Sequence, residues 1–136
     1  MHDNRLGRGK LEQLTRSFTE TFNDNDLDAM LSYFADEGSV YDQHNSAVAK
    51  GLAAIRAAFQ PQFDGDYGVM RFAAEDLFID PEQGKTMIRW LCSFDTKRGR
   101  TGWRGLDILH FNDAGKITTK LTYAKAKALN LTPVEG

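Results

Sequence analysis

The chain changes from one hydrophobic period to another about halfway along, and this change limits its fold more than any other feature. In the first half, apolar residues recur at helical spacing, as in Leu11, Leu14, Phe18 and Phe22. After residue 68 they alternate in four runs that turn sequences separate. Helices followed by a strand meander are typical of an α+β fold, not of an alternating α/β sheet.

The first half predicts three helices. The first begins near Lys10, and the polar run 23–26 then supplies a turn and an N-cap for a short second helix. The third begins near Lys50 or Gly51 and is expected to stop before Pro61, which cannot donate a helical hydrogen bond. The remaining expected segments are a short strand at 38–42, a loop at 43–49 and a crossing loop at 60–68.

Both faces of the predicted sheet carry apolar side chains. The strands are expected near 69–80, 85–96, 101–112 and 116–127. In the second of them, Ile88, Trp90 and Cys92 share one face with Phe94, while Met87 and Leu91 lie on the other. Three short helices can cover only one face, so we expect a homodimer that forms through the uncovered side of the sheet.

Length and charge narrow the class of protein. A chain of 136 residues fits one domain, and we expect a flexible leader at 1–9 followed by a single domain at 10–136. A net charge of -2 does not suit nucleic-acid binding. The polar first residues and the lack of a long apolar run predict no secretion signal and no membrane contact. With the single Cys92, these features predict a cytoplasmic protein.

Several sequence pieces are similar to one known family. They are Asn23-Asp24-Asn25-Asp26-Leu27-Asp28, Phe34-Ala35-Asp36, Val40-Tyr41-Asp42, Gly51-Leu52-Ala53-Ala54-Ile55-Arg56, and the run from Leu106-Asp107 to Ile117. Together they resemble the bacterial ketosteroid isomerases and the SnoaL-like proteins. The resemblance implies a cone-shaped, cystatin-like fold, in which three N-terminal helices pack on a curved, mostly antiparallel sheet.

The same resemblance implies roles for three positions. Asp42 falls where the isomerases have their proton-shuttling carboxylate, and Asp107 falls where they have an Asp that donates a hydrogen bond to the developing oxyanion. Phe18 falls where they have a donating Tyr. Because losing one oxyanion donor costs a factor of about 10²–10³ in rate, steroid isomerisation itself is not expected. The resemblance leaves open the chemistry of polyketide cyclases, dehydratases and epoxide hydrolases, which share the fold.

The charged candidates have alternative interpretations. Asp107 lies in an apolar run, so its carboxyl group must be neutral, paired with Lys120 or an Arg, or directed into a polar pocket. Lys120 shares a strand face with Thr118 and Thr122; it faces the pocket or extends to solvent from an edge strand. Asp42 is either a pocket carboxylate or a solvated turn residue.

A set of mostly aromatic residues is expected to contact a ligand in the pocket, although each could equally be plain core or surface. The expected set is Phe18, Trp90, Phe94, Trp103, Lys120, His44 and Tyr41. The three His residues and the one Cys lack the spacing of metal ligands, and no glycine-rich phosphate loop occurs. We therefore expect no metal and no cofactor.

Three functions remain open at this point. The chain is an isomerase or lyase for a small apolar carbonyl compound, with Asp42 as general base and Asp107 stabilising the enolate. Alternatively, it is a non-catalytic module that holds a small hydrophobic ligand and dimerises through its sheet. The third hypothesis is a purely structural dimerisation domain, whose interior would be filled.

Overall fold

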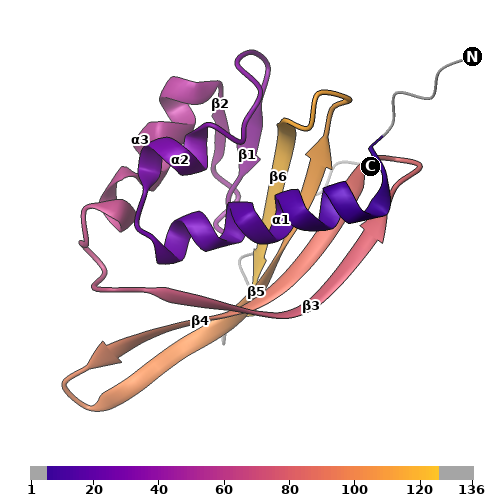
Figure 1. Cartoon of the computed structure of the whole chain (residues 1–136). Coiled ribbons are helices and arrows are strands. Elements are labelled where there is room, and N and C mark those ends of the chain that lie inside the picture. The colour runs from indigo at the N-terminus through magenta and orange to yellow at the C-terminus, as the bar shows by residue number, and fades with distance from the viewer. Residues whose placement is uncertain (1–5, 126–136) are drawn as a thin grey trace, which may run out of the picture.

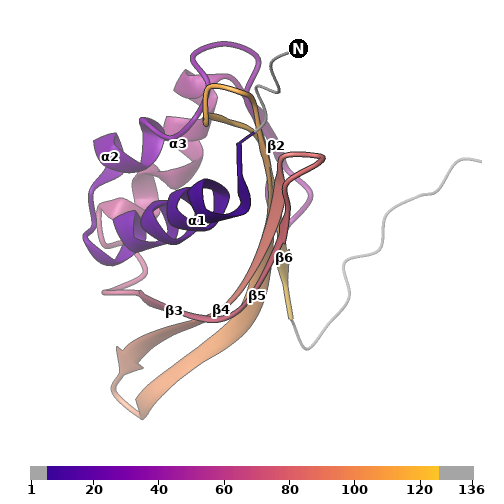
Figure 2. The same cartoon turned by 45° about the vertical axis from the view of Figure 1, so that its right-hand side comes forward.

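Three helices lie on the concave side of a curved six-stranded sheet (Figures 1 and 2). This computed structural model describes residues 6–125. It confirms the predicted α+β class and the cone-like arrangement of helices over a sheet. None of the helices in the described part of the chain is long and apolar enough to cross a membrane.

The helices are α1 (Arg8–Asn23), α2 (Leu27–Leu31) and α3 (Leu52–Phe63). Helix α1 begins two residues earlier than expected, inside the predicted leader, and the first five leader residues lie outside the described range. The predicted N-cap of α2 is confirmed, because the Asp26 carboxylate accepts a 3.0 Å hydrogen bond from the N–H of Ala29.

The prediction that the third helix stops before Pro61 is wrong, because α3 continues to Phe63. Proline lacks only its own N–H, so the helix loses one bond and can keep the next ones. Two contacts hold this last turn. Phe63 is buried against Phe22 and Phe59, and its carbonyl accepts a hydrogen bond of 3.0 Å from Nδ2 of Asn25.

The strands are β1 (Val40–Asp42), β2 (Val48–Lys50), β3 (Arg71–Asp80), β4 (Lys85–Thr96), β5 (Gly99–Phe111) and β6 (Ile117–Ala124). Their order in the sheet is β2-β1-β6-β5-β4-β3, and every neighbouring pair is antiparallel except β1 and β6. The four long strands match the predicted runs, although 126–127 lie outside the described residues. The predicted loop 43–49 is partly wrong, since it contains the start of β2.

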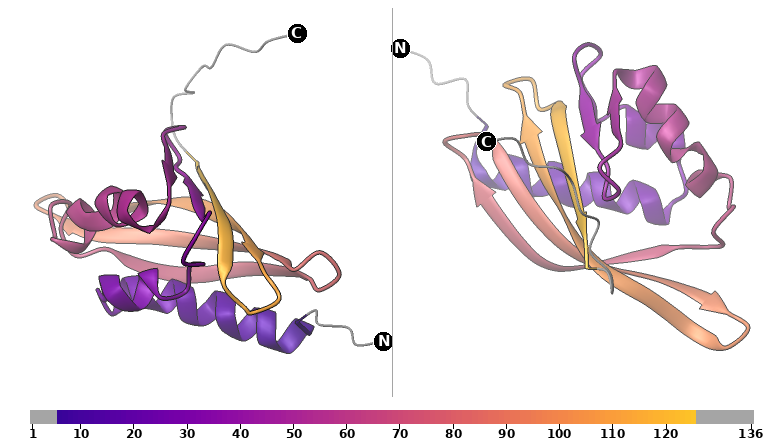
Figure 3. Two further views of the ribbon diagram at one scale, coloured as in Figure 1. Left: turned by 90° about the horizontal axis from the view of Figure 1, so that it is seen from above. Right: turned by 180° about the vertical axis from the view of Figure 1, so that it is seen from behind.

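The two faces of the sheet have different surroundings. Ile88, Trp90 and Cys92 of β4 are buried on the inner face, under the helices. On the outer face, Phe78 and Tyr123 remain 63% and 58% exposed. Seen from behind, this outer face has no helix of the described range in front of it (Figure 3).

Candidate functional site

A cavity of about 630 Å³ opens between helices α1 and α3 and the inner face of the sheet. Its walls are mostly aromatic, and the rings come from both layers of the fold: Phe22, Tyr41, Phe59, Phe72, Trp90, Phe94 and Trp103. Polar side chains also line it, from the loop after β1 and from α3: Gln43, His44, Asn45 and Gln62. The cavity therefore presents broad apolar walls with a few polar positions.

Ring contacts fix the shape of the walls. Tyr41 stacks on Phe59 with 4.5 Å between ring centroids and 6° between ring planes. Phe22 of α1 lies 5.5 Å from Phe59 and 5.4 Å from Phe72, so one ring joins α3 to β3. Aromatic contacts of this kind hold rings in defined orientations. The apolar walls are thus built by the packing of the core itself.

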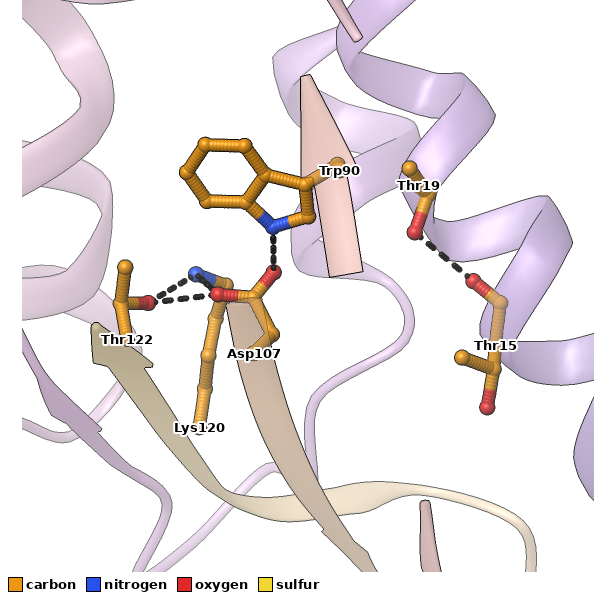
Figure 4. Close-up of polar contacts among 6 residues, drawn as sticks. All are labelled: Thr15, Thr19, Trp90, Asp107, Lys120 and Thr122. Atoms are coloured by element: carbon orange, nitrogen blue, oxygen red, sulfur yellow. Dashed lines mark hydrogen bonds and ion pairs between the residues drawn. The ribbon is translucent and has the colours of Figure 1, made fainter. Parts of the chain in front are cut away.

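Four polar side chains meet on the sheet side of the cavity (Figure 4). Lys120 Nζ lies 3.0 Å from Oδ1 of Asp107 and 2.6 Å from the Thr122 hydroxyl, to which it donates. The Thr122 hydroxyl in turn donates to Oδ1 of Asp107 at 2.7 Å. The indole N–H of Trp90 donates to Oδ2 of Asp107 at 3.2 Å. Asp107 is the acceptor in all three of its contacts.

Strand register brings these groups together. Asp107 is directly opposite Thr122 in the β5–β6 pair and opposite Ile88 in the β4–β5 pair. Lys120 and Trp90 each lie two residues along a neighbouring strand, within diagonal reach on the same face. Residues from β4, β5 and β6 therefore converge on one carboxylate.

The pair of charges is almost fully buried. Asp107 and Lys120 are 5% and 3% exposed, respectively. The Lys120 Nζ also lies 4.5 Å from the Tyr41 ring centroid and 5.4 Å from that of Phe59, within range of cation–π attraction. An ammonium has three N–H donors, and within the described residues Asp107 and Thr122 take two of them. One donor is left for a ligand.

These contacts resolve the alternatives for Asp107 and Lys120. Asp107 lines the cavity and is also paired with Lys120, so two of the three predicted environments apply together. The alternative that Lys120 extends to solvent from an edge strand is wrong. Strand β6 is not an edge strand, because it lies between β1 and β5, and Lys120 is buried there.

Asp42 is not among the residues that line the cavity, which corrects the expectation of a pocket carboxylate at this position. In the β1–β6 pair Tyr41 is opposite Lys120, whereas Asp42 is opposite Leu121. Because residues alternate between faces along a strand, Tyr41 has the inward position and Asp42 the outward one. Tyr41 is buried, as an inward residue should be.

Phe18 also does not line the cavity. It is fully buried in the helix-side core, where its ring makes edge contacts with Phe22, Tyr33 and Phe34 at 5.4, 5.7 and 5.8 Å. The expectation that Phe18 contacts a ligand is therefore not met. The other expected residues lie on the cavity wall: Trp90, Phe94, Trp103, Lys120, His44 and Tyr41.

Several cavity residues were not among the site residues predicted from the sequence. Thr122 had a signal, since it shares the inward face of β6 with Lys120. Phe59 had a signal too, because it follows Leu52 and Ile55 at helical spacing within the third predicted helix. Tyr67 and Met70 belong to the irregular segment between α3 and β3, where no periodicity shows which way a side chain points.

The lone cysteine lies outside the cavity wall. Cys92 is fully buried beside Ile88 and Trp90, and burial raises the pKa of its thiol from 9.0 to about 11. The thiol is therefore protonated at neutral pH and is a poor nucleophile there.

Comparison with known proteins adds a family and a set of similar folds. Residues 15–120 match the family described as the SnoaL-like domain. A search of curated proteins finds no match. The chain is similar in structure to SalBIII, an epoxide hydrolase/cyclase-like enzyme in pyran ring formation in the polyether salinomycin. That match has a TM-score of 0.73 and 16% identity, and it covers 86% of this chain and 92% of that one.

Two further solved structures are similar. A protein of unknown function with a cystatin-like fold from Methylobium petroleophilum has a TM-score of 0.73 and 20% identity, with 96% of this chain and 86% of that chain covered. A polyketide cyclase, itself assigned provisionally, from Xanthomonas campestris pv. campestris has a TM-score of 0.69 and 22% identity. That match covers 89% of this chain and 92% of the Xanthomonas chain. At these identities the likeness establishes the fold alone.

Proposed function

The chain belongs to the SnoaL-like domain family, and from that premise we propose that it binds a small, mostly apolar carbonyl compound in the cavity and catalyses proton transfer at the carbon next to the carbonyl group. A volume of about 630 Å³ suits such a molecule, since ligand sites span about 300–1,000 Å³. The aromatic walls suit a compound with rings. The third hypothesis, a structural domain with a filled interior, does not fit a cavity of this size.

The observation that carries the proposal is the Asp107–Lys120 pair on the cavity wall. Burying two charges costs desolvation energy that a simple apolar pair would avoid. Titratable groups that converge in a concave, apolar site are candidates for acid–base chemistry. A base and a cation in contact are the two groups that proton transfer beside a carbonyl requires.

The contacts suit the Asp107 carboxylate and the Lys120 ammonium to different roles. Oδ1 of Asp107 already accepts from Lys120 and Thr122, whereas among residues 6–125 Oδ2 accepts only from Trp90, at the longer distance of 3.2 Å. Oδ2 is therefore the oxygen with capacity to take a proton from the carbon next to the carbonyl. The remaining N–H of Lys120 can stabilise negative charge on the carbonyl oxygen. In this proposal Asp107 replaces Asp42 as the base.

The similar structures support ring-containing substrates. One is a cyclase-like enzyme of pyran ring formation, and another carries a provisional polyketide cyclase assignment. The aromatic cavity walls of this chain agree with compounds of that shape.

Deuterium exchange tests the proposal directly. Enolisable ring ketones, such as 2-tetralone, are screened for a rise in melting temperature and then followed by NMR in D₂O. We expect the protein to accelerate exchange at the carbon beside the carbonyl, and Asp107→Asn to abolish that acceleration. Asp42→Asn is the matched control, because its carboxylate lies on the other face of β1. Loss of exchange in Asp42→Asn with normal exchange in Asp107→Asn contradicts the assignment.

A second candidate is binding without turnover. Two observations favour it: Phe18 lies in the core instead of providing a donor, and Asp42 lies outside the cavity. The same screen separates the two functions. A non-catalytic module gives a melting shift with 2-tetralone but no exchange above the rate in buffer.

Dimerisation through the outer face of the sheet remains part of the proposal. Phe78 and Tyr123 are exposed there, and Met87, Leu91 and Leu106 are only partly covered. A second copy that packs on this face would bury them. Light scattering is expected to give the mass of two chains, and Leu106→Asp to shift it to one. A wild-type monomer at micromolar concentration would contradict the proposed dimer.

We also keep a cytoplasmic location as a proposal.

A further inference from the structure

The cavity wall carries a primary amine, which can act as a nucleophile as well as a hydrogen-bond donor. This amine belongs to Lys120, which lies on the wall of the apolar cavity and is 3% exposed. We infer that Lys120 forms a covalent imine with the carbonyl compound that the cavity binds. This inference rests on the proposed function and adds to it a nucleophilic role for Lys120.

A proton acceptor for the ammonium is in place. Nucleophilic attack needs the neutral amine, and Oδ1 of Asp107 lies 3.0 Å from Lys120 Nζ. Proton transfer across this contact converts an ion pair into a neutral amine and a neutral acid. In an apolar environment the neutral pair carries little desolvation cost, so the transfer costs less there than in water.

The steps balance in atoms and charge. The amine lone pair attacks the carbonyl carbon, a C–N bond forms, and the carbonyl oxygen takes the proton held by Asp107. The second proton on nitrogen then leaves to the Asp107 carboxylate, and the hydroxyl departs as water with that proton while the C=N bond forms. The nitrogen keeps one proton and carries the positive charge of the iminium. Ketone and ammonium thus give iminium and water, and Asp107 ends as it began.

The surrounding rings suit both ends of this conversion. Tyr41 and Phe59 lie 4.5 and 5.4 Å from Nζ, within range of cation–π attraction. The ammonium and the iminium each carry one positive charge at this atom. The rings therefore do not oppose formation of the product.

The imine also activates the carbon beside the former carbonyl group more strongly than a hydrogen bond does. Phe18 offers no hydroxyl group to stabilise an enolate, and it does not reach the cavity. An iminium withdraws electrons from the neighbouring carbon more strongly than a hydrogen-bonded carbonyl does. The proton on that carbon can then pass to Oδ2 of Asp107, the oxygen that accepts from Trp90 at 3.2 Å.

Borohydride trapping tests the inference. The protein is incubated with an equimolar amount of 2-naphthaldehyde, reduced with sodium borohydride, and examined by intact mass and peptide mapping. We expect one reduced adduct, located at Lys120. Lys120→Arg is expected to lose this adduct. Lys116→Arg is the control and is expected to retain the adduct, because the Lys116 amine lies on the surface, where it donates to the Ser32 carbonyl.

Binding is followed separately, so that the two proposals fail in different ways. 2-Methoxynaphthalene has the same ring system without an aldehyde, and its binding is measured by quenching of tryptophan fluorescence. If it binds and Lys120 is labelled no more than the surface lysines, the imine is overturned and the binding proposal stands. If neither compound binds and no adduct forms at Lys120, both proposals are overturned.

Discussion

The Tyr41 ring and the Lys120 ammonium face each other across the parallel pair of strands β1 and β6, 4.5 Å apart. This pairing directs Lys120 into the cavity and towards Asp107, and it turns Asp42 to the other face of the sheet. The register of the three-residue strand β1 therefore places Asp42 away from the cavity, whose lining includes Asp107.

Removing the charge of Lys120 should destabilise the fold strongly. Lys120→Met leaves the Asp107 carboxylate buried with Thr122 and Trp90 as its donors in the described part of the chain. Loss of one partner of a buried ion pair costs about 3–5 kcal/mol. Urea unfolding of the wild type and the variant measures the difference in the free energy of unfolding.

The double variant Asp107→Leu with Lys120→Met is the control for this prediction. It removes both charges and keeps apolar volume, so we expect it to recover most of the lost stability. If the single variant unfolds at the same urea concentration as the wild type, the pair is not buried as the structure has it.

Gly105 should not tolerate a side chain. A Cβ at this position would overlap Cη2 of Trp90 and lie 2.6 Å from the carbonyl oxygen of Tyr123. We expect Gly105→Ala to displace the indole, weaken its hydrogen bond to Asp107, and cost about 1–3 kcal/mol, as overpacking does. Unfolding by urea gives the energy, and near-ultraviolet circular dichroism reports the changed indole environment.

Gly9→Ala provides the matched control. Gly9 lies in α1, and an added Cβ meets nothing within 4 Å. Alanine is the better helix former, but Gly9 is only the second residue of α1, so we expect this variant to keep or slightly raise the stability. Equal effects of the two substitutions would contradict the close approach of Trp90 to Gly105.

Much of the fold follows from periodicity alone, because long amphipathic segments repeat their signal. Alternation located β3, β4, β5 and β6 to within a few residues. The end of α3 could not be found in this way. Whether a helix continues past Pro61 depends on what Phe63 packs against, and that partner, Phe22, is distant in sequence.

The site was harder to predict, and the reason is register. The conflict between an apolar run and the charge of Asp107 indicated a special environment for that residue. Asp42 showed no such conflict, so only the resemblance pointed to it. On a short strand, a shift of one residue exchanges the inward and outward faces, and the sequence of β1 alone does not set that register.

Cys92 predicts a fall in stability at alkaline pH. Burial raises the pKa of the folded thiol from 9.0 to about 11. Between these values the unfolded chain releases the thiol proton and the folded chain keeps it. The contribution to stability is therefore complete below pH 9.0 and is lost as the pH rises towards 11. Urea unfolding across this range should show a steeper decline for the wild type than for Cys92→Ala. Parallel declines would show that other groups cause it.

Asn23 should prove as important for the cavity wall as the aromatic residues themselves. Its side chain pairs with both backbone groups of Phe72: Nδ2 donates to the carbonyl at 2.9 Å, and Oδ1 accepts from the N–H at 2.7 Å. Asn23 thus acts as a neighbouring strand for the first residues of β3. Asn23→Ala is expected to cost about 1–3 kcal/mol, the penalty for leaving partly buried polar groups without partners.

Asn23→Asp separates the two bonds, because the carboxylate keeps an acceptor for the Phe72 N–H and loses the donor. That carboxylate also faces the Phe72 carbonyl and the Glu20 carboxylate, to which the Asn23 amide donates at 2.9 and 3.2 Å. We therefore expect Asn23→Asp to lose at least as much stability as Asn23→Ala. Gln60→Ala removes an amide whose exposed hydrogen bond goes to Asp64, and a change within about 0.5 kcal/mol is expected there. Since Phe72 forms part of the wall beside Phe22, fraying of β3 should also weaken binding of 2-methoxynaphthalene. If Asn23→Ala matches Gln60→Ala in both measurements, the amide does not hold β3 in place.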